Sequence, residues 1–246
     1  MKEKVDEIVK WLNMQLKESG QKGFVLGLSG GIDSALVAQL LMLANPKNSL
    51  GVILPAGNLN VDRRHGMESA KACKMPCIEV DLTDYRENLF SDINTALSRF
   101  TTLNTETRAK NTVMGNLGAR LRMAALYDIG NTLNYLVVGT DNMAEAYTGY
   151  FTKYGDGGVD ILPLAHLTKS EVFEMGAYLG VPQDIINKPP SAGFFTSQTD
   201  EEEMGVDYNT IDNYLNGEII SDEKREIIEK LHLTSDHKRK LPPTVR

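Results

Sequence analysis

Short apolar runs alternate with longer amphipathic segments along this chain. Mostly apolar runs over 24–26, 50–54, 77–80 and 136–139 are typical of buried strands in a parallel sheet, and 160–162 predicts a fifth, short strand. The segments between the first four runs carry apolar residues at helical spacing. Strands separated by helices indicate βαβ units. We therefore predict an α/β, Rossmann-like fold: an open parallel five-stranded sheet with helices on both faces.

Apolar periodicity and end signals bound the predicted helices. Thr168, with Glu171 three residues later, forms a capping box that starts one helix, whereas Gly130 and Asn131 end the longest one. The predicted helices cover 5–16, 35–45, 61–74, 83–100, 109–127, 143–150, 168–179, 208–215 and 221–231. Because the chain has no internal repeats and no linker of biased composition, we predict a single domain over 1–246.

The stretch 188–205 differs in composition from the rest of the chain. It contains Pro189, Pro190 and Gly193, and it includes the acidic run 200–203. A loop of this length inside a compact domain is usually functional or disordered. We predict a mobile loop here.

A glycine-rich stretch follows the first predicted strand. Gly27-Leu28-Ser29-Gly30-Gly31-Ile32-Asp33-Ser34 joins that strand to a helix, an arrangement that aims backbone N–H groups and a helix N-terminus at an anion. Gly30 and Gly31 let a phosphate approach the backbone closely. The stretch lacks the Lys and the Ser or Thr that end a Walker A loop, and Asp33 stands near the position of that Lys. An acid beside phosphates implies a metal ion between them, so we predict a pyrophosphate-binding loop for ATP and Mg²⁺. A tight turn without a ligand is the alternative.

A second loop is expected to meet the first one. Ligands bind beyond the carboxyl ends of parallel strands, near the point where strand order reverses. If the strand 24–26 lies beside the strand 136–139, the loop 139–145 converges on the glycine-rich stretch. Asp33 and Glu145 then become candidates to hold Mg²⁺. Taken alone, Glu145 could equally be a solvated acid on a helix.

Several basic residues allow more than one interpretation. Arg120 and Arg122 lie on one helix and point in different directions, so at most one of them faces a given ligand, and a structural ion pair is the alternative. Lys153 lies in a glycine-rich loop. Lys169 is either a surface lysine or a phosphate ligand.

The four histidines have no nucleophile or metal-ligand pattern near them in the sequence. His65 and His232 are expected at the surface, and His166 is undecided. His237 belongs to a basic tail in which solvated charge is the default.

Composition and charge exclude several classes of protein. A net charge of -7 argues against nucleic acid or an anionic membrane as the main partner. Cys73 and Cys77 are the only cysteines, they match no zinc pattern, and they suit a reducing, cytoplasmic compartment. No apolar run is long enough to span a bilayer, and the first residues lack a signal-peptide core.

Taken together, these motifs resemble a known family. The stretch 27–34 resembles the PP-loop of N-type ATP pyrophosphatases, which have an adenine nucleotide alpha hydrolase-like fold. Further motifs are similar to those of ammonia-dependent NAD synthetases, and the similarity runs from about Gly23 to the tail. These motifs are Asn116–Arg120, Val138–Asp141, Glu145–Gly149, Phe151–Gly158, Leu162–Leu164, Leu167–Lys169 and His237–Arg239. The Thr-Lys-Tyr-Gly-Asp-Gly-Gly run at 152–158 is the most specific to the family.

The resemblance implies an activity, a set of substrates and an assembly. Deamido-NAD would be amidated to NAD with ATP, through an adenylated intermediate and with release of AMP and pyrophosphate. Ammonia would be the nitrogen source, because the chain has no room for the amidase domain of glutamine-dependent relatives. Family members are homodimers with the dinucleotide site at the subunit interface, and 188–205 would be a flexible lid.

The resemblance also implies site residues. ATP would contact Gly27, Leu28, Ser29, Gly30, Gly31, Ile32, Asp33, Ser34, Thr140, Lys169 and Ser191. Ser191 stands where the family often has Thr, and it keeps the hydroxyl. Deamido-NAD would contact Arg120, Lys153, Asp160, His237 and Lys238. Asp33 and Glu145 would hold Mg²⁺. With no side-chain nucleophile, the transition state would be stabilised by Ser29, Asp33, Ser34 and Lys169.

Two alternatives stay open at the level of sequence. One is another PP-loop adenylating enzyme, tRNA-thiolating or GMP-forming, although the acidic charge and the lack of cysteine motifs disfavour tRNA. The other is a non-catalytic nucleotide sensor on the same scaffold, which would need neither Glu145 nor a lid.

Overall fold

A four-stranded parallel sheet forms the centre of the protein. The computed structural model describes residues 1–57, 60–100, 110–188 and 199–245. The strands are β1 (Gly23–Gly27), β2 (Ser49–Ile53), β3 (Cys77–Glu79) and β4 (Tyr135–Val138), in the order β3-β2-β1-β4. Val25 pairs with Leu50 on one side and with Val137 on the other. Strand order therefore reverses between β1 and β4. This neighbouring arrangement is the condition under which the loops after these two strands were expected to meet.

The predicted fifth strand is wrong. Within the described chain, 160–162 contributes only an isolated bridge between Ile161 and Val138. The backbone N–H of Val137 donates to the Asp160 carboxylate at 2.8 Å, so a side chain takes the place of a strand partner. Pro163 has no N–H to continue a ladder. In the part of the chain that the structure describes, the sheet therefore has four strands rather than five.

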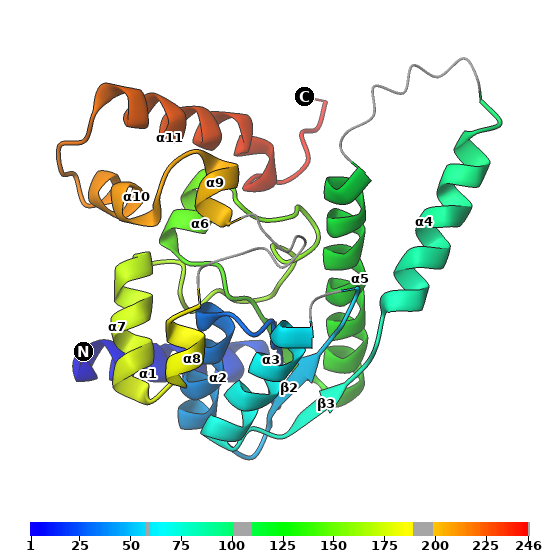
Figure 1. The fold of residues 1–246 in the computed structure, drawn as a ribbon. Coiled ribbons are helices and arrows are strands. Elements are labelled where there is room, and N and C mark those ends of the chain that lie inside the picture. Colours follow the sequence, from blue (N-terminus) through cyan, green and yellow to red (C-terminus); the bar gives the residue numbers. More distant parts are fainter. Residues whose placement is uncertain (58–59, 101–109, 189–198, 246) are drawn as a thin grey trace.

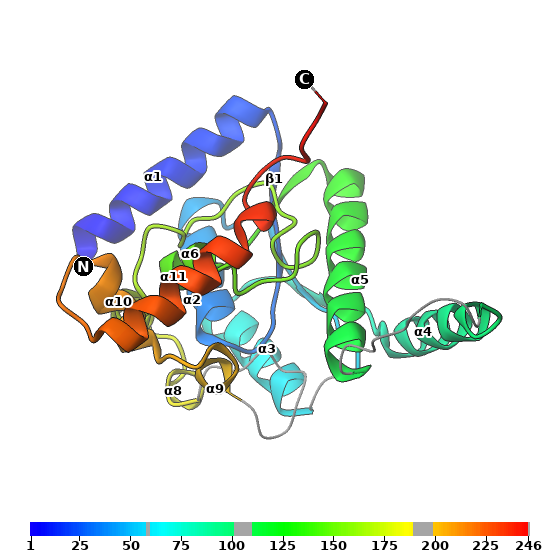
Figure 2. The ribbon, with the colours of Figure 1, turned by 90° about the horizontal axis from the view of Figure 1, so that it is seen from above.

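Helices cover both faces of the sheet, as predicted. One layer contains α1 (Lys2–Ser19), α2 (Ile32–Ala44), α3 (Asn60–Cys73), α7 (Lys169–Leu179) and the short α8 (Gln183–Ile186). The long helix α5 (Lys110–Leu133) packs on β1 and β4 from the other side (Figures 1 and 2). Alternate side chains of β1 divide between these layers, because Phe24 and Leu26 join the first core and Val25 joins the second.

A third apolar core lies beyond the carboxyl ends of the strands. It is built from α6 (Met143–Thr148), α9 (Asp200–Met204), α10 (Tyr208–Leu215) and α11 (Asp222–Thr234), which lie together at the top of Figure 1. A 3-10 helix, Asp236–Lys238, follows α11.

The predicted mobile loop over 188–205 is only partly described. Residues 189–198, which include Ser191, lie outside the described residues. Asp200–Met204 forms the helix α9, so the prediction of a loop is wrong there. Thr199 and Glu202 cap this helix reciprocally, a signal that the sequence carried.

Two helices differ from their predicted bounds. The helix α5 continues past Gly130 to Leu133. A Cβ on Gly130 would lie 3.1 Å from the Tyr135 carbonyl oxygen and 3.2 Å from Val137, so this glycine allows close packing and does not end the helix. The helix α4 (Thr83–Leu97) ends earlier than predicted and stands away from the rest of the molecule (Figures 1 and 2). None of the described helices combines the length and apolar content needed to cross a bilayer.

Candidate active site

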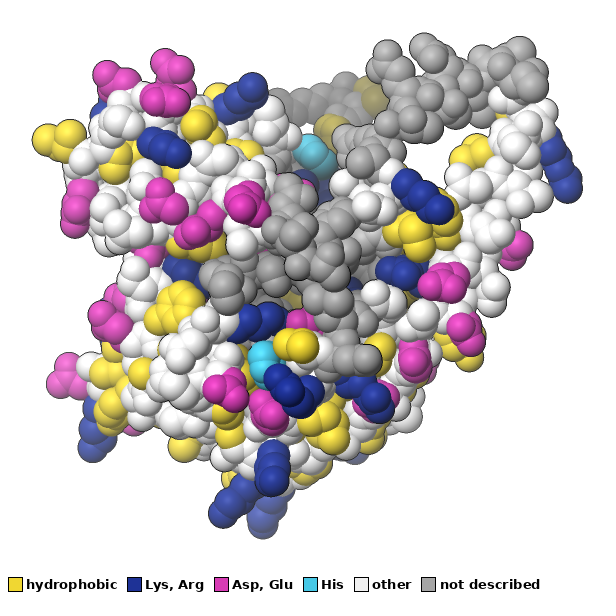
Figure 3. Space-filling model, in the orientation of Figure 1, with side chains coloured by type: hydrophobic (Ala, Val, Ile, Leu, Met, Phe, Trp, Pro, Cys, Tyr) yellow, Lys and Arg dark blue, Asp and Glu magenta, His cyan; other side chains and the backbone are white. Residues whose placement is uncertain are grey.

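A cavity of about 820 Å³ lies beyond the carboxyl ends of β1 and β4. The loops that follow these two strands form much of its wall, together with side chains from α6, α7 and α9. Its lining includes Leu28, Ser29, Gly31, Asp33, Thr140, Asp141, Glu145, Lys169, Asp200 and Lys238. Figure 3 shows charged side chains of both signs on the two parts of the molecule above and below the centre of this view. The glycine-rich loop after β1 and the loop after β4, which were predicted to converge, therefore line one cavity.

The glycine-rich loop has the geometry of an anion site. Gly30 has a φ of 78°, and a Cβ there would lie 2.4 Å from the Asp62 carbonyl oxygen, so no other residue fits without a shift. Ser29 Oγ lies 3.0 Å from Ser34 Oγ, and Ser34 Oγ donates to the Gly31 carbonyl at 3.0 Å. Gly31 is the N-cap of α2, and within the described residues no side chain caps this helix. Its first backbone N–H groups therefore remain available to a phosphate.

Lys169 joins the two predicted metal ligands. Its Nζ lies 2.6 Å from Asp33 Oδ2 and 3.4 Å from Glu145 Oε1. Asn142 Nδ2 donates to the other Asp33 oxygen at 2.9 Å. The Lys169 side chain is only 3% exposed, so its interpretation as a surface lysine is wrong.

Capping boxes at two helix starts place these residues. Asn142 caps α6, and its side chain and backbone exchange hydrogen bonds with Glu145, the third residue of that helix. Thr168 and Glu171 cap α7 in the same way and fix Lys169 as its first residue. The second box was predicted. The first is equally visible as Asn-x-x-Glu, and it was missed.

The cavity wall holds more negative charge than Lys169 can neutralise. Burial raises the pKa of Glu145 to about 7, and the charge of Asp33 adds to this rise while Lys169 opposes it. Burial also raises the pKa of Asp141 well above its ordinary range, with further contributions from Asp156, Glu145 and Asp33. Burial disfavours the charged form of Lys169, yet the neighbouring carboxylates raise its pKa overall.

Asp33 and Glu145 fit a hard cation such as Mg²⁺. Both supply carboxylate oxygens, the donor type that Mg²⁺ prefers, and Mg²⁺ commonly takes its remaining ligands from phosphates and water. Among the described residues, no group of three or more acidic, His or Cys side chains is arranged to hold a metal ion. The protein would therefore contribute a pair of carboxylates and the nucleotide the rest.

Four of the five residues expected to bind deamido-NAD lie close together. Arg120 Nε donates to the Lys153 carbonyl at 3.3 Å, and Lys153 Nζ donates to the His237 carbonyl. Lys238 Nζ donates to the carbonyls of Gly149 and Phe151 at 2.7 and 2.6 Å.

Asp160 has different hydrogen-bond partners. It accepts hydrogen bonds from Tyr127 Oη at 3.0 Å and from the Val137 N–H at 2.8 Å. As expected, Arg120 and Arg122 diverge, because Arg122 Nε donates to the Leu54 carbonyl at 2.9 Å.

Two histidines expected at the surface are not there. His65 is buried on α3, and its Cβ lies 3.0 Å from where a Cβ on Gly30 would stand. His232 is partly buried: its ring stacks on Tyr147 at 4.1 Å, and its Nδ1 lies 2.8 Å from the Tyr147 carbonyl oxygen. Both histidines pack against residues that are distant in the sequence. Their burial could therefore not be predicted from the polarity of the neighbouring residues.

Comparison with known proteins decides among the candidate families. The NAD synthase family model matches residues 4–242. The chain belongs to the NAD synthase family. It is 50% identical over 240 residues to an NH(3)-dependent NAD(+) synthetase from Alkaliphilus oremlandii, covering 98% of this chain and 95% of the relative.

Solved structures of similar proteins share the fold. An NMN synthetase from Francisella tularensis superimposes with a TM-score of 0.91 at 40% identity, covering 99% of this chain and 98% of the other. An NH3-dependent NAD synthetase from Campylobacter jejuni gives a TM-score of 0.79 at 25% identity, covering 100% and 98%. The prediction of a carbon–nitrogen ligase that amidates deamido-NAD with ATP and ammonia is confirmed at the level of the family.

Proposed function

We propose that this cavity converts deamido-NAD, ATP and ammonia into NAD, AMP and pyrophosphate. The observation that carries the proposal is the convergence of an uncapped helix start with Asp33, Glu145 and Lys169 in one cavity. The first feature suits the phosphates of ATP, and the carboxylates suit the cation that accompanies them. We assign residues 1–246 to one catalytic domain.

The chemistry requires positioning and charge stabilisation more than a nucleophile. The nicotinate carboxylate attacks the α-phosphorus of ATP and expels pyrophosphate, and ammonia then attacks the acyl carbon and expels AMP. The backbone N–H groups of 27–34, the hydroxyls of Ser29 and Ser34 and the Lys169 ammonium bind and orient the pyrophosphate. Mg²⁺ held by Asp33 and Glu145 would supply further stabilisation of the departing charge.

The remaining expected contacts follow the same division. Thr140 and Lys169 both line the cavity, and we assign both to ATP together with Ser191, which lies outside the described residues. Lys238 lines the cavity. His237 precedes it in the chain, and hydrogen bonds join His237 to Lys153 and Lys153 to Arg120. We assign this group, together with Asp160, to deamido-NAD.

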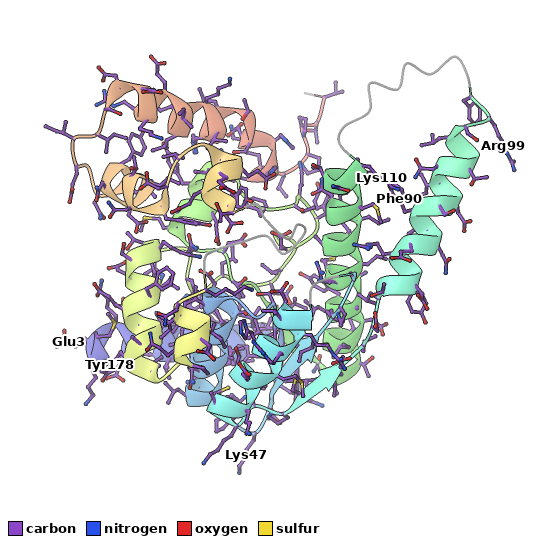
Figure 4. The ribbon with its side chains drawn as sticks, viewed as in Figure 1. Glu3, Lys47, Phe90, Arg99, Lys110 and Tyr178 are labelled. Carbon is purple, nitrogen blue, oxygen red and sulfur yellow. The ribbon has the colours of Figure 1, made fainter. Side chains whose placement is uncertain are left out.

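We also propose that the protein is a homodimer through α4. Tyr85, Leu89, Ile93 and Leu97 recur every four residues on this helix and are 68, 40, 46 and 46% exposed. Hydrophobic side chains are visible along α4 in Figure 3, and Phe90 lies toward Lys110 of α5 in Figure 4, 5.8 Å from ring centroid to Nζ. An exposed apolar stripe of this kind marks an interaction surface. These four residues are visible in the sequence, but their spacing is equally typical of a helix face that packs on the protein core. Their exposure could therefore not be predicted.

A second candidate substrate is nicotinate mononucleotide, the deamido form of NMN. The high structural similarity to an NMN synthetase favours it. Measuring kcat/KM for both substrates with saturating ATP and ammonium separates the two, because the preferred substrate gives the higher value. We assign the dinucleotide as the main substrate, and we assign the cytoplasm as the location because both cysteines are free thiols.

The variant Asp33→Asn tests the assigned roles. ATP–pyrophosphate exchange in the presence of deamido-NAD should fall by at least about 100-fold, whereas deamido-NAD binding should change little. Asp6→Asn, an exposed acid on α1, is the matched control and should retain exchange. An equal loss of exchange and dinucleotide binding in Asp33→Asn would contradict the metal role.

A further inference from the structure

The helix α10 presents two buried polar side chains to the start of α7. Tyr208 and Asp212 are one turn apart on α10 and are 4 and 3% exposed. Neither residue belongs to a recognisable sequence motif. Both contact Lys169, the residue that joins the two proposed metal ligands.

Asp212 fixes the backbone of α7. Its Oδ1 accepts the Lys169 N–H at 3.0 Å, and its Oδ2 accepts the Ser170 N–H at 2.9 Å and the Ser170 hydroxyl at 2.8 Å. These backbone N–H groups belong to the first turn of a helix, where no carbonyl of the same helix is available to them. Asp212 of α10 therefore acts together with the Thr168 capping box to hold Lys169 where it enters the cavity wall.

Tyr208 contacts the charged end of the same residue and its partner. The Lys169 ammonium lies 4.7 Å from the centroid of the Tyr208 ring. The Tyr208 hydroxyl lies 3.1 Å from Glu145 Oε1 and 3.3 Å from Asp200 Oδ2. A tyrosine hydroxyl can donate one hydrogen bond, whereas an ionised carboxylate only accepts. The Tyr208 hydroxyl has one proton for two carboxylates, and the shorter contact is to Glu145.

We propose that Tyr208 is a positioning residue for the carboxylate of Glu145 that would bind Mg²⁺. Its hydroxyl fixes Oε1 of Glu145, while the Asn142 N–H fixes Oε2 at 3.1 Å, so the carboxylate is held from both ends. Asp200 Oδ2 of α9 lies 3.3 Å from the same hydroxyl, so α9 also contributes to its surroundings. The inference rests on the proposed function, because it takes Mg²⁺ with ATP as the ligand of Asp33 and Glu145.

The variant Tyr208→Phe isolates the hydroxyl. The ring stays in the apolar core of α6, α9, α10 and α11 and stays over the Lys169 ammonium. Hydrogen-bond partners that orient metal ligands typically contribute about 10- to 100-fold in metal affinity. Tyr214→Phe is the matched control, because it removes a hydroxyl from the same helix. That hydroxyl lies 3.4 Å from both Tyr147 Oη and Glu229 Oε1.

The test measures Mn²⁺ binding by electron paramagnetic resonance with α,β-methylene ATP present. The Kd for Mn²⁺ should rise about tenfold or more in Tyr208→Phe and stay at the wild-type value in Tyr214→Phe. The metal concentration for half-maximal turnover should rise by the same factor, with KM for ammonium unchanged. Thermal unfolding of each variant shows that it is folded.

The outcomes separate this inference from the proposed function. A wild type that binds Mn²⁺, with a folded Tyr208→Phe variant that binds it equally well, overturns the positioning role alone. A wild type that binds no Mn²⁺ with the nucleotide overturns the proposed metal pair and the positioning role together. Failure of the wild type to make NAD while Mn²⁺ binding depends on Tyr208 overturns only the assigned reaction.

Discussion

The ammonium of Lys169 lies 2.6 Å from the carboxylate of Asp33, although the two residues are 136 positions apart. Glu145 completes this group at 3.4 Å from the same nitrogen. The N-terminal turns of α2, α6 and α7, which carry Asp33, Glu145 and Lys169, thereby meet beside the phosphate-binding loop. Since the Lys169 side chain is 3% exposed, the two carboxylates depend on it for charge compensation in the ligand-free protein.

Removing the Lys169 charge should destabilise the fold. Lys169→Met leaves two poorly exposed carboxylates without their cation, and breaking a buried pair from one side typically costs about 3–5 kcal/mol. Lys4→Met is the control, because Lys4 is half-exposed in its ion pair with Glu171 and should cost at most about 1 kcal/mol. Urea unfolding at pH 7 measures both. Equal losses in the two variants would contradict the account.

The stability of the ligand-free protein should fall as pH rises toward neutrality. The folded pKa of Glu145 is about 7, against an ordinary value of 4.5, so the folded state holds this proton more tightly than the unfolded state does. Folding therefore takes up a proton between these values, and the benefit is lost as pH rises through about 7. The whole shift corresponds to about 3 kcal/mol.

Glu145→Gln removes this titration. The difference in unfolding free energy between wild type and Glu145→Gln, measured in urea at pH 5, 6 and 7, should change in favour of the variant with increasing pH. A difference that does not vary with pH would show that Glu145 titrates near its ordinary value.

Gly30 should tolerate no side chain. Gly30→Ala places a Cβ 2.4 Å from the Asp62 carbonyl oxygen in a backbone with φ 78°, so the phosphate-binding loop must shift. Gly217→Ala has the same kind of backbone, φ 80°, with nothing within 4 Å, and should cost only about 1–2 kcal/mol. Gly30→Ala should lose ATP–pyrophosphate exchange while Gly217→Ala keeps it. Full exchange in Gly30→Ala would mean that the loop does not bind the phosphates.

Much of this arrangement could be predicted from the sequence because its signals are local. The strands 24–26 and 136–139, the glycine-rich loop and the Thr168 capping box all rest on neighbouring residues. The juxtaposition of Asp33 and Glu145 also followed, because parallel strands place their carboxyl-end loops at one edge.

The remaining features depend on contacts between distant segments. Tyr208 and Asp200 reach Glu145 only through packing of the helices beyond the sheet, which no local pattern encodes. His65 is polar but buried against the glycine-rich loop, and Gly130 resembles a helix end but allows α5 to pack on β4. The false fifth strand arose because a side chain, Asp160, replaces a backbone partner.

The exposed stripe on α4 should control assembly. Ile93→Asp introduces a charge into a face that would be buried between subunits, so sedimentation should show a monomer where the wild type is a dimer. Ile219→Asp, at a residue that is 97% exposed between α10 and α11, is the control and should remain dimeric. A wild type that sediments as a monomer would contradict the proposed dimer.

Product analysis tests the central claim most directly. The protein is incubated with ATP, Mg²⁺, ammonium and deamido-NAD, and the nucleotides are separated and quantified. The account predicts NAD and AMP in equal amounts, together with pyrophosphate, and a dependence on all four components. ADP and phosphate as products, or no turnover, would contradict it.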